Sequence, residues 1–238
     1  MKKLFLSIAC MLSLTVFAQD AKVFNDANAV KRNLNGSFNA ISVSSGIDLY
    51  LTQGNEESLA VSANEQQYLD RMITEVVNGT LKIYFNNKGF TWKHGNRRLR
   101  AYVSCKTLEN LSASAGSDVQ VSGNINTSKL DVEVSSGAVF TGAITASEMN
   151  ATISSGAAMK VTGSAANLTV DVSSGANFKG FDFAVDYCNA KASSGAGVHI
   201  TINKELSAKA SSGGDILYKG TGLIRDIKTS GGGSVKKV

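Results

Sequence analysis

A tripeptide, Ser-Ser-Gly, recurs along the chain at a nearly constant interval and restricts the fold more than any other feature. From the first of the regular copies onward, successive glycines lie 18 to 21 residues apart. This period matches one coil of a β-solenoid and fits neither a coiled coil nor collagen. The tripeptide or a degenerate form of it ends at Gly46, Gly116, Gly137, Gly156, Gly175, Gly195, Gly213 and Gly231.

Each repeat approaches its glycine through alternating apolar residues, as at Leu130, Val132 and Val134 before Gly137. Alternation with a period of two predicts a β-strand with one face turned inward. A second apolar group follows the glycine, and a further glycine such as Gly163 closes most repeats. We therefore predict an all-β, single-stranded parallel β-helix in which each coil has at least two strands and two corners.

The serines and glycines are interpreted as structural corner positions. Each corner of a solenoid stacks on the same corner of the next coil, about 4.8 Å away. A serine hydroxyl both donates and accepts, so corner hydroxyls can form a ladder along the axis, while glycine supplies the bend. A serine nucleophile would need a histidine and an acid beside it. The two histidines, His94 and His199, do not recur with the serines, so no catalytic residue is assigned.

The N-terminus has the pattern of an export signal. Lys2 and Lys3 precede an apolar stretch, and Val16-Phe17-Ala18 forms a small-residue cleavage pattern. The apolar stretch is too short to span a bilayer comfortably. We predict a signal peptide over residues 1–18, a polar lead-in over 19–36 and a β-helix domain over 37–238. Its coils are expected to be irregular over 37–107 and regular over 108–238.

This pattern predicts an exported protein of the periplasm, the outer-membrane surface or the medium, with no transmembrane segment after cleavage. Without residues 1–18 the chain keeps 22 Lys and Arg against 19 acids. These charges are dispersed, so nucleic acid is not an expected partner. Cys105 and Cys188 either form a disulfide or remain as two buried thiols, and the sequence leaves both readings open.

Three aspartates, Asp48, Asp118 and Asp215, each lie two residues after a corner glycine. Adjacent coils are not expected to supply a neighbouring acid, and the dense Gly-Asp pattern of calcium-binding repeats is missing. We therefore expect Asx turns, with no metal site and no cofactor. Asn78-Gly79, between two apolar segments, predicts a type I′ hairpin, and Asn64 is expected to cap one helical turn ending at Asp70.

The least regular stretch, residues 86–100, is the candidate contact region. An aromatic side chain among cations can stack on sugar rings or bind anionic groups. Alternatively, Trp92 covers the hydrophobic end of the solenoid, because terminal coils need covering. The candidate ligand-binding residues are Phe90, Trp92, Lys93, His94, Arg97 and Arg98.

The order of these features resembles the family described as "putative auto-transporter adhesin, head GIN domain", whose members are exported proteins of Bacteroidetes-type bacteria. The resemblance covers residues 38–238 and implies a right-handed parallel β-helix and a surface-interaction role, with no catalytic motif. It rests on Phe38–Val43 before Ser44-Ser45-Gly46-Ile47-Asp48-Leu49, on Asn78-Gly79-Thr80-Leu81-Lys82-Ile83, and on Leu108–Val119 before the repeats.

The leading functional hypothesis is a non-enzymatic cell-envelope protein, an adhesin that binds a glycan or an envelope protein. A second hypothesis is a β-helix that binds or cleaves polysaccharide, for which two facing carboxylates would be needed. A third is a structural module that forms homo-oligomers through an open coil edge. The carboxylates that could meet across coils are Asp131, Glu133, Asp171, Asp182 and Asp186.

Overall fold

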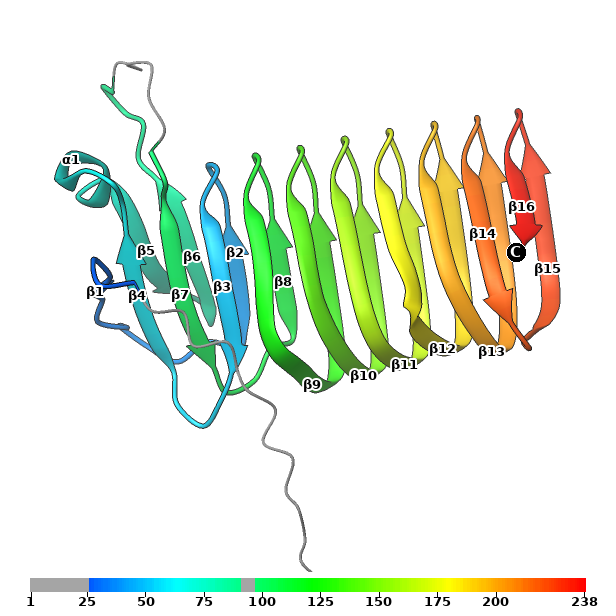
Figure 1. Cartoon of the computed structure of the whole chain (residues 1–238), viewed down its shortest axis with the longest axis horizontal. Helices are drawn as coiled ribbons and strands as arrows, with labels where there is room; N and C mark the ends of the chain where they lie inside the picture. Colours follow the sequence, from blue (N-terminus) through cyan, green and yellow to red (C-terminus); the bar gives the residue numbers. More distant parts are fainter. Residues whose placement is uncertain (1–25, 91–96) are drawn as a thin grey trace, which may run out of the picture.

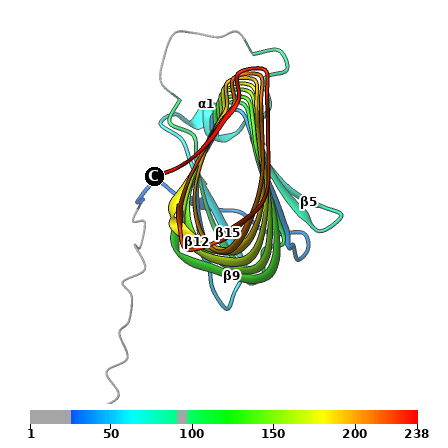
Figure 2. The same cartoon turned by 90° about the vertical axis from the view of Figure 1, so that its right-hand side faces the viewer.

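The computed structural model describes residues 26–90 and 97–238. Figure 1 shows a rod of stacked coils, with a row of tight turns along one edge. Viewed along the rod, each coil is narrow at these turns and broad at the opposite edge (Figure 2). Neighbouring coils are joined by parallel strand pairs. The predicted parallel β-solenoid is confirmed.

Each regular coil contains one long strand that leaves a tight turn, bends at the broad edge and returns to the next turn. We call the first half of each strand the outgoing face of the rod and the second half the incoming face. Inward and outward side chains alternate along both halves, as the sequence pattern predicts. The strands are β9 (Asp118–Val134), β10 (Val139–Ile153), β11 (Ala158–Val172), β12 (Asn177–Ser193) and β13 (Gly197–Ser211).

The tight corner is a type I′ turn. The Ala138 amide donates to the Ser135 carbonyl at 3.0 Å, and Ser136 and Gly137 have φ of 52° and 71°. Both central residues are thus left-handed, whereas the sequence assigned the bend to glycine alone. Eight such turns stack within the described chain.

The ladder that joins successive corners runs through the backbone. The Gly137 amide donates to the Ser155 carbonyl of the next coil at 3.0 Å, and Gly156 repeats this contact with Ser174. Among the described residues, no hydrogen bond joins corner hydroxyls of successive coils. The predicted hydroxyl ladder is therefore wrong, and the central serines of the five regular Ser-Ser-Gly turns are exposed: Ser136, Ser155, Ser174, Ser194 and Ser212.

The last corner lies one residue later than the sequence alignment indicated. Ser230 is in register with Ser211, so Gly231, with φ of 54°, occupies the place of the central serine, and Gly232, with φ of 78°, is the corner glycine. The alignment on Gly231 is therefore wrong, since Gly231, Gly232 and Gly233 follow one another and the sequence offers no landmark between them. The other seven corner glycines lie where predicted.

The broad corner is a bend within a continuous strand, so the prediction of two separate strands per coil is wrong. Gly163 makes this bend in β11 with φ of 105°. A Cβ atom at this position would lie 2.1 Å from the Ile144 carbonyl oxygen of the preceding coil. Glycine therefore permits both the left-handed conformation and the close approach of two backbones.

The upstream copy of the tripeptide stacks directly on the regular coils. Strands β2 (Ala40–Val43) and β3 (Asp48–Gln53) pair in parallel with β8 (Asn110–Ala113) and β9. The Gly46 amide donates to the Ala115 carbonyl at 2.9 Å. After β3 the chain forms the N-terminal end of the rod. It then returns to the opposite side of the β2–β3 coil, where β8 and β9 begin the regular coils.

The N-terminal end contains one further coil, made of β6 (Thr80–Phe85) and β7 (Arg100–Cys105). The Ser44 amide donates to Ile83 and the Asp48 amide to Leu99, so the irregular stretch between these strands takes the place of a Ser-Ser-Gly corner.

Antiparallel strands close this end. On the incoming face, β5 (Met72–Val77) pairs with β6 and confirms the hairpin at Asn78-Gly79. On the outgoing face, β4 (Ser58–Ser62) pairs with β7, and β1 (Val30–Lys31) pairs with β4. The helical turn α1 (Gln66–Leu69) begins after Glu65 without a side-chain cap, so the predicted Asn64 cap is wrong.

The opposite end has no comparable cover among the described residues. It consists of β14 (Asp215–Gly220), β15 (Leu223–Ser230) and β16 (Ser234–Lys237). Every residue of β15 is exposed, with Ile224 and Ile227 at 39% and 41% although they continue inward-facing rows. The two ends of the rod are therefore different surfaces.

Cys105 and Cys188 are free and buried, which excludes the disulfide reading. Burial raises the pKa of Cys105 to about 11 and that of Cys188 to about 12. Both sulfurs therefore remain thiols at neutral pH and act as small core side chains.

Asp26 anchors the N-terminal segment to the outgoing face. Its Oδ2 accepts hydrogen bonds from the Ser62 and Tyr102 hydroxyls at 2.6 and 2.7 Å, and Arg100 lies at 3.4 Å. These donors favour the ionised carboxylate. Led by the Ser62 and Tyr102 hydrogen bonds, they lower the pKa of Asp26 to about 2.

We expect Asp26→Asn to loosen this anchor at neutral pH. The folded pKa lies below the ordinary value of 3.8, so the contribution of Asp26 is present above pH 4 and disappears as the pH falls towards 2. The Arg32 amide donates to the Leu59 carbonyl and reports on this segment in hydrogen exchange. At pH 7 its protection factor should fall about tenfold, which corresponds to a decrease of roughly 1.4 kcal/mol in the free energy of local opening. The exposed control Asp182→Asn should leave it unchanged, and equal protection in wild type and Asp26→Asn would refute the anchor.

Two glycine-to-alanine substitutions separate the cost of a left-handed backbone conformation from the cost of a steric clash with the neighbouring coil. Gly156→Ala places a methyl group in open space at φ of 71°, so we expect a loss of about 1–2 kcal/mol from the left-handed conformation alone. Gly163→Ala adds the collision with Ile144 and should cost about 3 kcal/mol or more. Urea unfolding of the two variants measures the difference, and equal losses would contradict the backbone contact at the broad corner.

Candidate functional site

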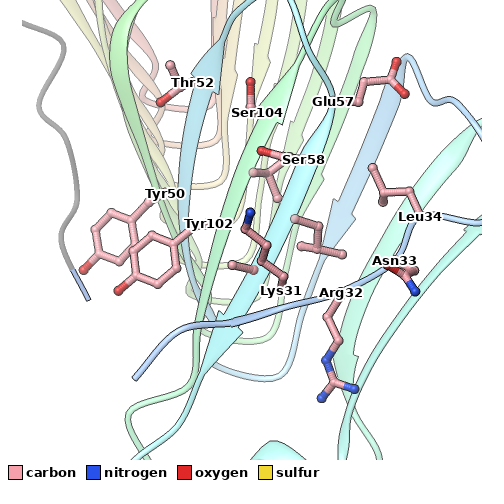
Figure 3. A pocket seen from close by; sticks show the side chains of 13 residues that line it. Lys31, Arg32, Asn33, Leu34, Tyr50, Thr52, Glu57, Ser58, Tyr102 and Ser104 are labelled. Atoms are coloured by element: carbon pink, nitrogen blue, oxygen red, sulfur yellow. The ribbon is translucent and has the colours of Figure 1, made fainter. Parts of the chain in front are cut away.

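A hollow of about 570 Å³ lies on the outgoing face near the N-terminal end. Its floor is the outer surface of β3, β7 and β4, and the segment Lys31–Leu34 forms one wall. Figure 3 shows Tyr50 and Tyr102 side by side at one edge of the hollow, with Lys31 and Ser58 near them. The Asp26 anchor holds the N-terminal segment close to this wall.

The two tyrosines form the most distinctive surface of the hollow. Tyr50 and Tyr102 are paired in register on β3 and β7, and their rings stack with centroids 5.2 Å apart and planes 13° apart. Stacking follows from the register, since outward side chains of adjacent parallel strands are separated by about 4.8 Å. Burial, together with the hydrogen bond to Asp26, raises the pKa of Tyr102 to about 12. Its hydroxyl therefore remains a donor at neutral pH.

Polar groups surround the aromatic edge. Lys31, Glu57 and Ser58 line the hollow along with Thr52 and Ser104. The Ser104 hydroxyl donates to the Glu56 carbonyl at 2.7 Å, which holds the β3–β4 loop against β7. A concave site with an aromatic edge and a few hydroxyl, carboxylate and ammonium groups can bind a polar ligand that also has apolar faces, as a sugar has.

The region that the sequence singled out lies elsewhere on the terminal coil. Trp92, Lys93 and His94 lie outside the described residues. Phe90 packs edge-on against Tyr68 and Phe85, with ring centroids 5.9 and 5.6 Å away. Among the predicted contact residues, Phe90 therefore helps to cover the end of the core.

The two arginines of this region differ from each other. Arg97 is half-buried with its guanidinium 5.0 Å from the centroid of the Phe85 ring, whereas Arg98 is exposed and has φ of 38°. Neither they nor Phe90 line the hollow. The described part of the predicted region is thus mainly an end cover.

Sequence reasoning missed the tyrosine pair because Tyr50 and Tyr102 lie 52 positions apart in the sequence. Each occupies an outward position of a predicted strand, between Leu49 and Leu51 and between Ala101 and Val103. Two aromatic residues at outward positions were a detectable signal, but their pairing required the order of the coils.

A second hollow, of about 730 Å³, lies on the incoming face and contains two of the five carboxylates considered above, Asp131 and Glu133. The Asn150 amide donates to Asp131 at 2.7 Å. Asp186 instead pairs with Lys204 at 2.8 Å near the broad edge of β12, and Asp182 is exposed. The five carboxylates therefore do not converge on one site.

The aspartates that follow the corner glycines, Asp48, Asp118 and Asp215, differ from the sequence prediction at one point. Asp48 and Asp118 are paired in register, so the statement that adjacent coils supply no neighbouring acid is wrong. The coils of Asp48 and Asp118 touch although the sequence separates them. Burial and, second to it, the charge of Asp118 raise the pKa of Asp48. Within residues 26–90 and 97–238, no three His, Cys, Asp or Glu side chains form a group able to hold a metal ion.

Solved structures with the same fold come from Bacteroides and Parabacteroides species. A "putative adhesin" from Bacteroides fragilis NCTC 9343 has a TM-score of 0.81 at 17% identity, over 90% of this chain and 98% of that one. A "putative adhesin" from Parabacteroides merdae ATCC 43184 has a TM-score of 0.70 at 17% identity, over 90% and 97%. A "putative lipid binding protein" from Parabacteroides distasonis ATCC 8503 has a TM-score of 0.60 at 22% identity, over 90% and 98%.

Among curated proteins, no sequence matches the chain. None of the helices in the described residues is long and apolar enough to cross a membrane. The family described as "Putative auto-transporter adhesin, head GIN domain" matches residues 37–222. That span contains the hairpin, the terminal coil and seven of the eight stacked turns, and the chain therefore belongs to the head GIN domain family.

Proposed function

We propose that this protein is a non-enzymatic adhesion module of the cell envelope that binds carbohydrate in the hollow beside Tyr50 and Tyr102. The stacked tyrosine pair is the observation that carries the proposal, because aromatic side chains at a concave polar surface suit the apolar faces of sugar rings. The family description, an adhesin, supports a surface-interaction role. The export pattern of residues 1–18 supports a location in the periplasm, at the outer-membrane surface or outside the cell.

The arrangement of groups in the hollow favours binding over chemistry. Among the described residues, Glu57 is the one carboxylate that lines it, whereas glycoside cleavage commonly needs two carboxylates on opposite sides of the bond. The Asp26 carboxylate is already occupied by Ser62, Tyr102 and Arg100. The hollow thus offers an aromatic edge and hydrogen-bonding groups that can hold a sugar without activating it.

Tyr50→Ala tests this assignment on a glycan array with the mature chain. An aromatic contact contributes about 0.5–1.5 kcal/mol, so its loss should lower the affinity for the glycans that the wild type retains about threefold to tenfold. Tyr84→Ala is the matched control, because Tyr84 points outward on the incoming face of the same terminal coil as Tyr102. Retention should be unchanged in the control, and both variants are compared by thermal unfolding. Equal retention by wild type and Tyr50→Ala would refute the hollow as the binding site.

The non-enzymatic part of the proposal has its own experiment. Incubation with envelope and plant polysaccharides should release no new reducing ends, because the described residues that line the hollow include no facing acid pair. Asp131→Asn and Glu133→Gln serve as controls for the second hollow, where two carboxylates do share a surface. Cleavage by the wild type that either substitution abolishes would replace the adhesin proposal with a polysaccharide-cleaving enzyme.

A further inference from the structure

We infer that the ligand is a linear acidic polysaccharide, which lies along the rod from the tyrosine pair to a group of cations on the outgoing face. This inference rests on the proposed function and names the ligand class for an extended form of the same site. Three features support it: the register of the outward side chains, two lysines that have no ion pair among the described residues, and an aromatic bulge beside these lysines.

One outward position on the outgoing face forms an unbroken row across the coils. Each member pairs in register with the next, so the row advances by one coil, about 4.8 Å, at each residue. Aromatic groups stand at its N-terminal end, neutral polar groups in the middle, and two lysines and a histidine beyond them. The row consists of Tyr102, Tyr50, Gln120, Thr141, Lys160, Lys179 and His199.

The lysines of this row carry uncompensated charge. Lys160 and Lys179 are adjacent in register and exposed, and like charges at paired positions repel each other. Within the described chain neither lysine has an ion pair. A bound anion would therefore relieve a repulsion that the fold itself leaves in place.

Four of the outward positions that flank these side chains are neutral, and the exposed carboxylate of Asp182, in the bulge of β12, forms no ion pair with Lys160 or Lys179. Asn177 and Gly197 lie on the side of the tight turns, and Thr162 and Thr201 on the side of the broad edge. Two of the three lysines in the corresponding row of the incoming face have an acidic neighbour, whereas Lys209, which lies between them in register, is paired with lysines on both sides. Lys191 adjoins Asp171 in register, and Lys228 pairs with Asp226 at 2.7 Å.

A bulge in β12 adds an aromatic group next to the cations. The register between β12 and β13 shifts after Gly180, and the Phe181 ring stacks on His199 with centroids 4.9 Å apart and planes 8° apart. The Lys219 ammonium lies 5.3 Å from the centroid of the same ring. An aromatic ring among cations can contact a sugar face while the ammonium groups bind its carboxylate.

A polymer of acidic sugars fits this surface better than a small anion does. A single carboxylate would use one lysine, whereas the row offers a lysine at each of two successive coils. An extended chain of uronic acid residues presents one carboxylate per sugar, at a repeat comparable with the spacing of the coils. Its neutral ring faces can also reach the tyrosines at the other end of the row.

The test uses polygalacturonate as the probe, and its fully methyl-esterified form as the uncharged control, with the full mature chain. Wild type should bind polygalacturonate, more weakly as salt increases, and should bind the esterified polymer at least tenfold less tightly. The double variant Lys160→Gln/Lys179→Gln should lose about tenfold in affinity. Lys191→Gln/Lys209→Gln removes the same charge from the opposite face of neighbouring coils and should lose less than about twofold.

Several outcomes would overturn the inference. Equal losses in the two double variants would show that net charge, and not the row, attracts the polymer. Equal binding of the esterified polymer would remove the role of the carboxylates. Competition by duplex DNA as strong as that by polygalacturonate would refute the polysaccharide assignment.

Comparison with Tyr50→Ala separates this inference from the proposed function. If Lys160→Gln/Lys179→Gln binds polygalacturonate like wild type while Tyr50→Ala loses glycan retention, the acidic ligand is wrong and the adhesin proposal stands. If the lysine variant loses binding while Tyr50→Ala retains every glycan, the cationic row is a site and the hollow is not.

Discussion

The parallel pairing of each coil with the next is the interaction on which the rest of this structure depends. Backbone hydrogen bonds join every regular coil to its neighbours along both faces and at the tight turns. This pairing sets one separation, about 4.8 Å, for all side chains at equivalent positions. Side chains therefore occur in rows, and each row must be compatible with close neighbours of its own kind. Inward rows meet this requirement with apolar groups such as Val134, Ile153 and Val172.

The same pairing explains why the ends of the rod differ from its middle. A terminal coil offers unpaired backbone groups that could pair with another chain. At the N-terminal end β5 and β4 cover these edges with antiparallel strands, and α1 adds Tyr68 and Leu69 to the core. At the C-terminal end the strands β15 and β16 carry Lys228, Lys236 and Lys237, and the charges of these residues disfavour pairing with a second copy.

The regular part of the fold could be predicted from the sequence because its information is local. The tripeptide marks each tight turn, and the alternation before Gly137 or Gly175 marks the strand that leads to it. The errors arose where a decision needed distant residues or local geometry. The contact of Asp48 with Asp118 depends on a coil order that the chain reaches only after a long detour. The choice between Gly231 and Gly232 depends on register with Ser211. The tyrosine pair could be predicted only as two separate outward residues.

The repeat also gives the rod a property that a globular domain lacks. Each regular coil contacts only its immediate neighbours, so the distance from Tyr50 to Lys160 is a whole number of coils. Insertion or deletion of one coil between β9 and β11 would change that distance by about 4.8 Å while leaving both ends intact. The length of such a rod can therefore change only in steps of one coil. A ligand with a similar repeat would be recognised by its number of units instead of by the shape of a single pocket.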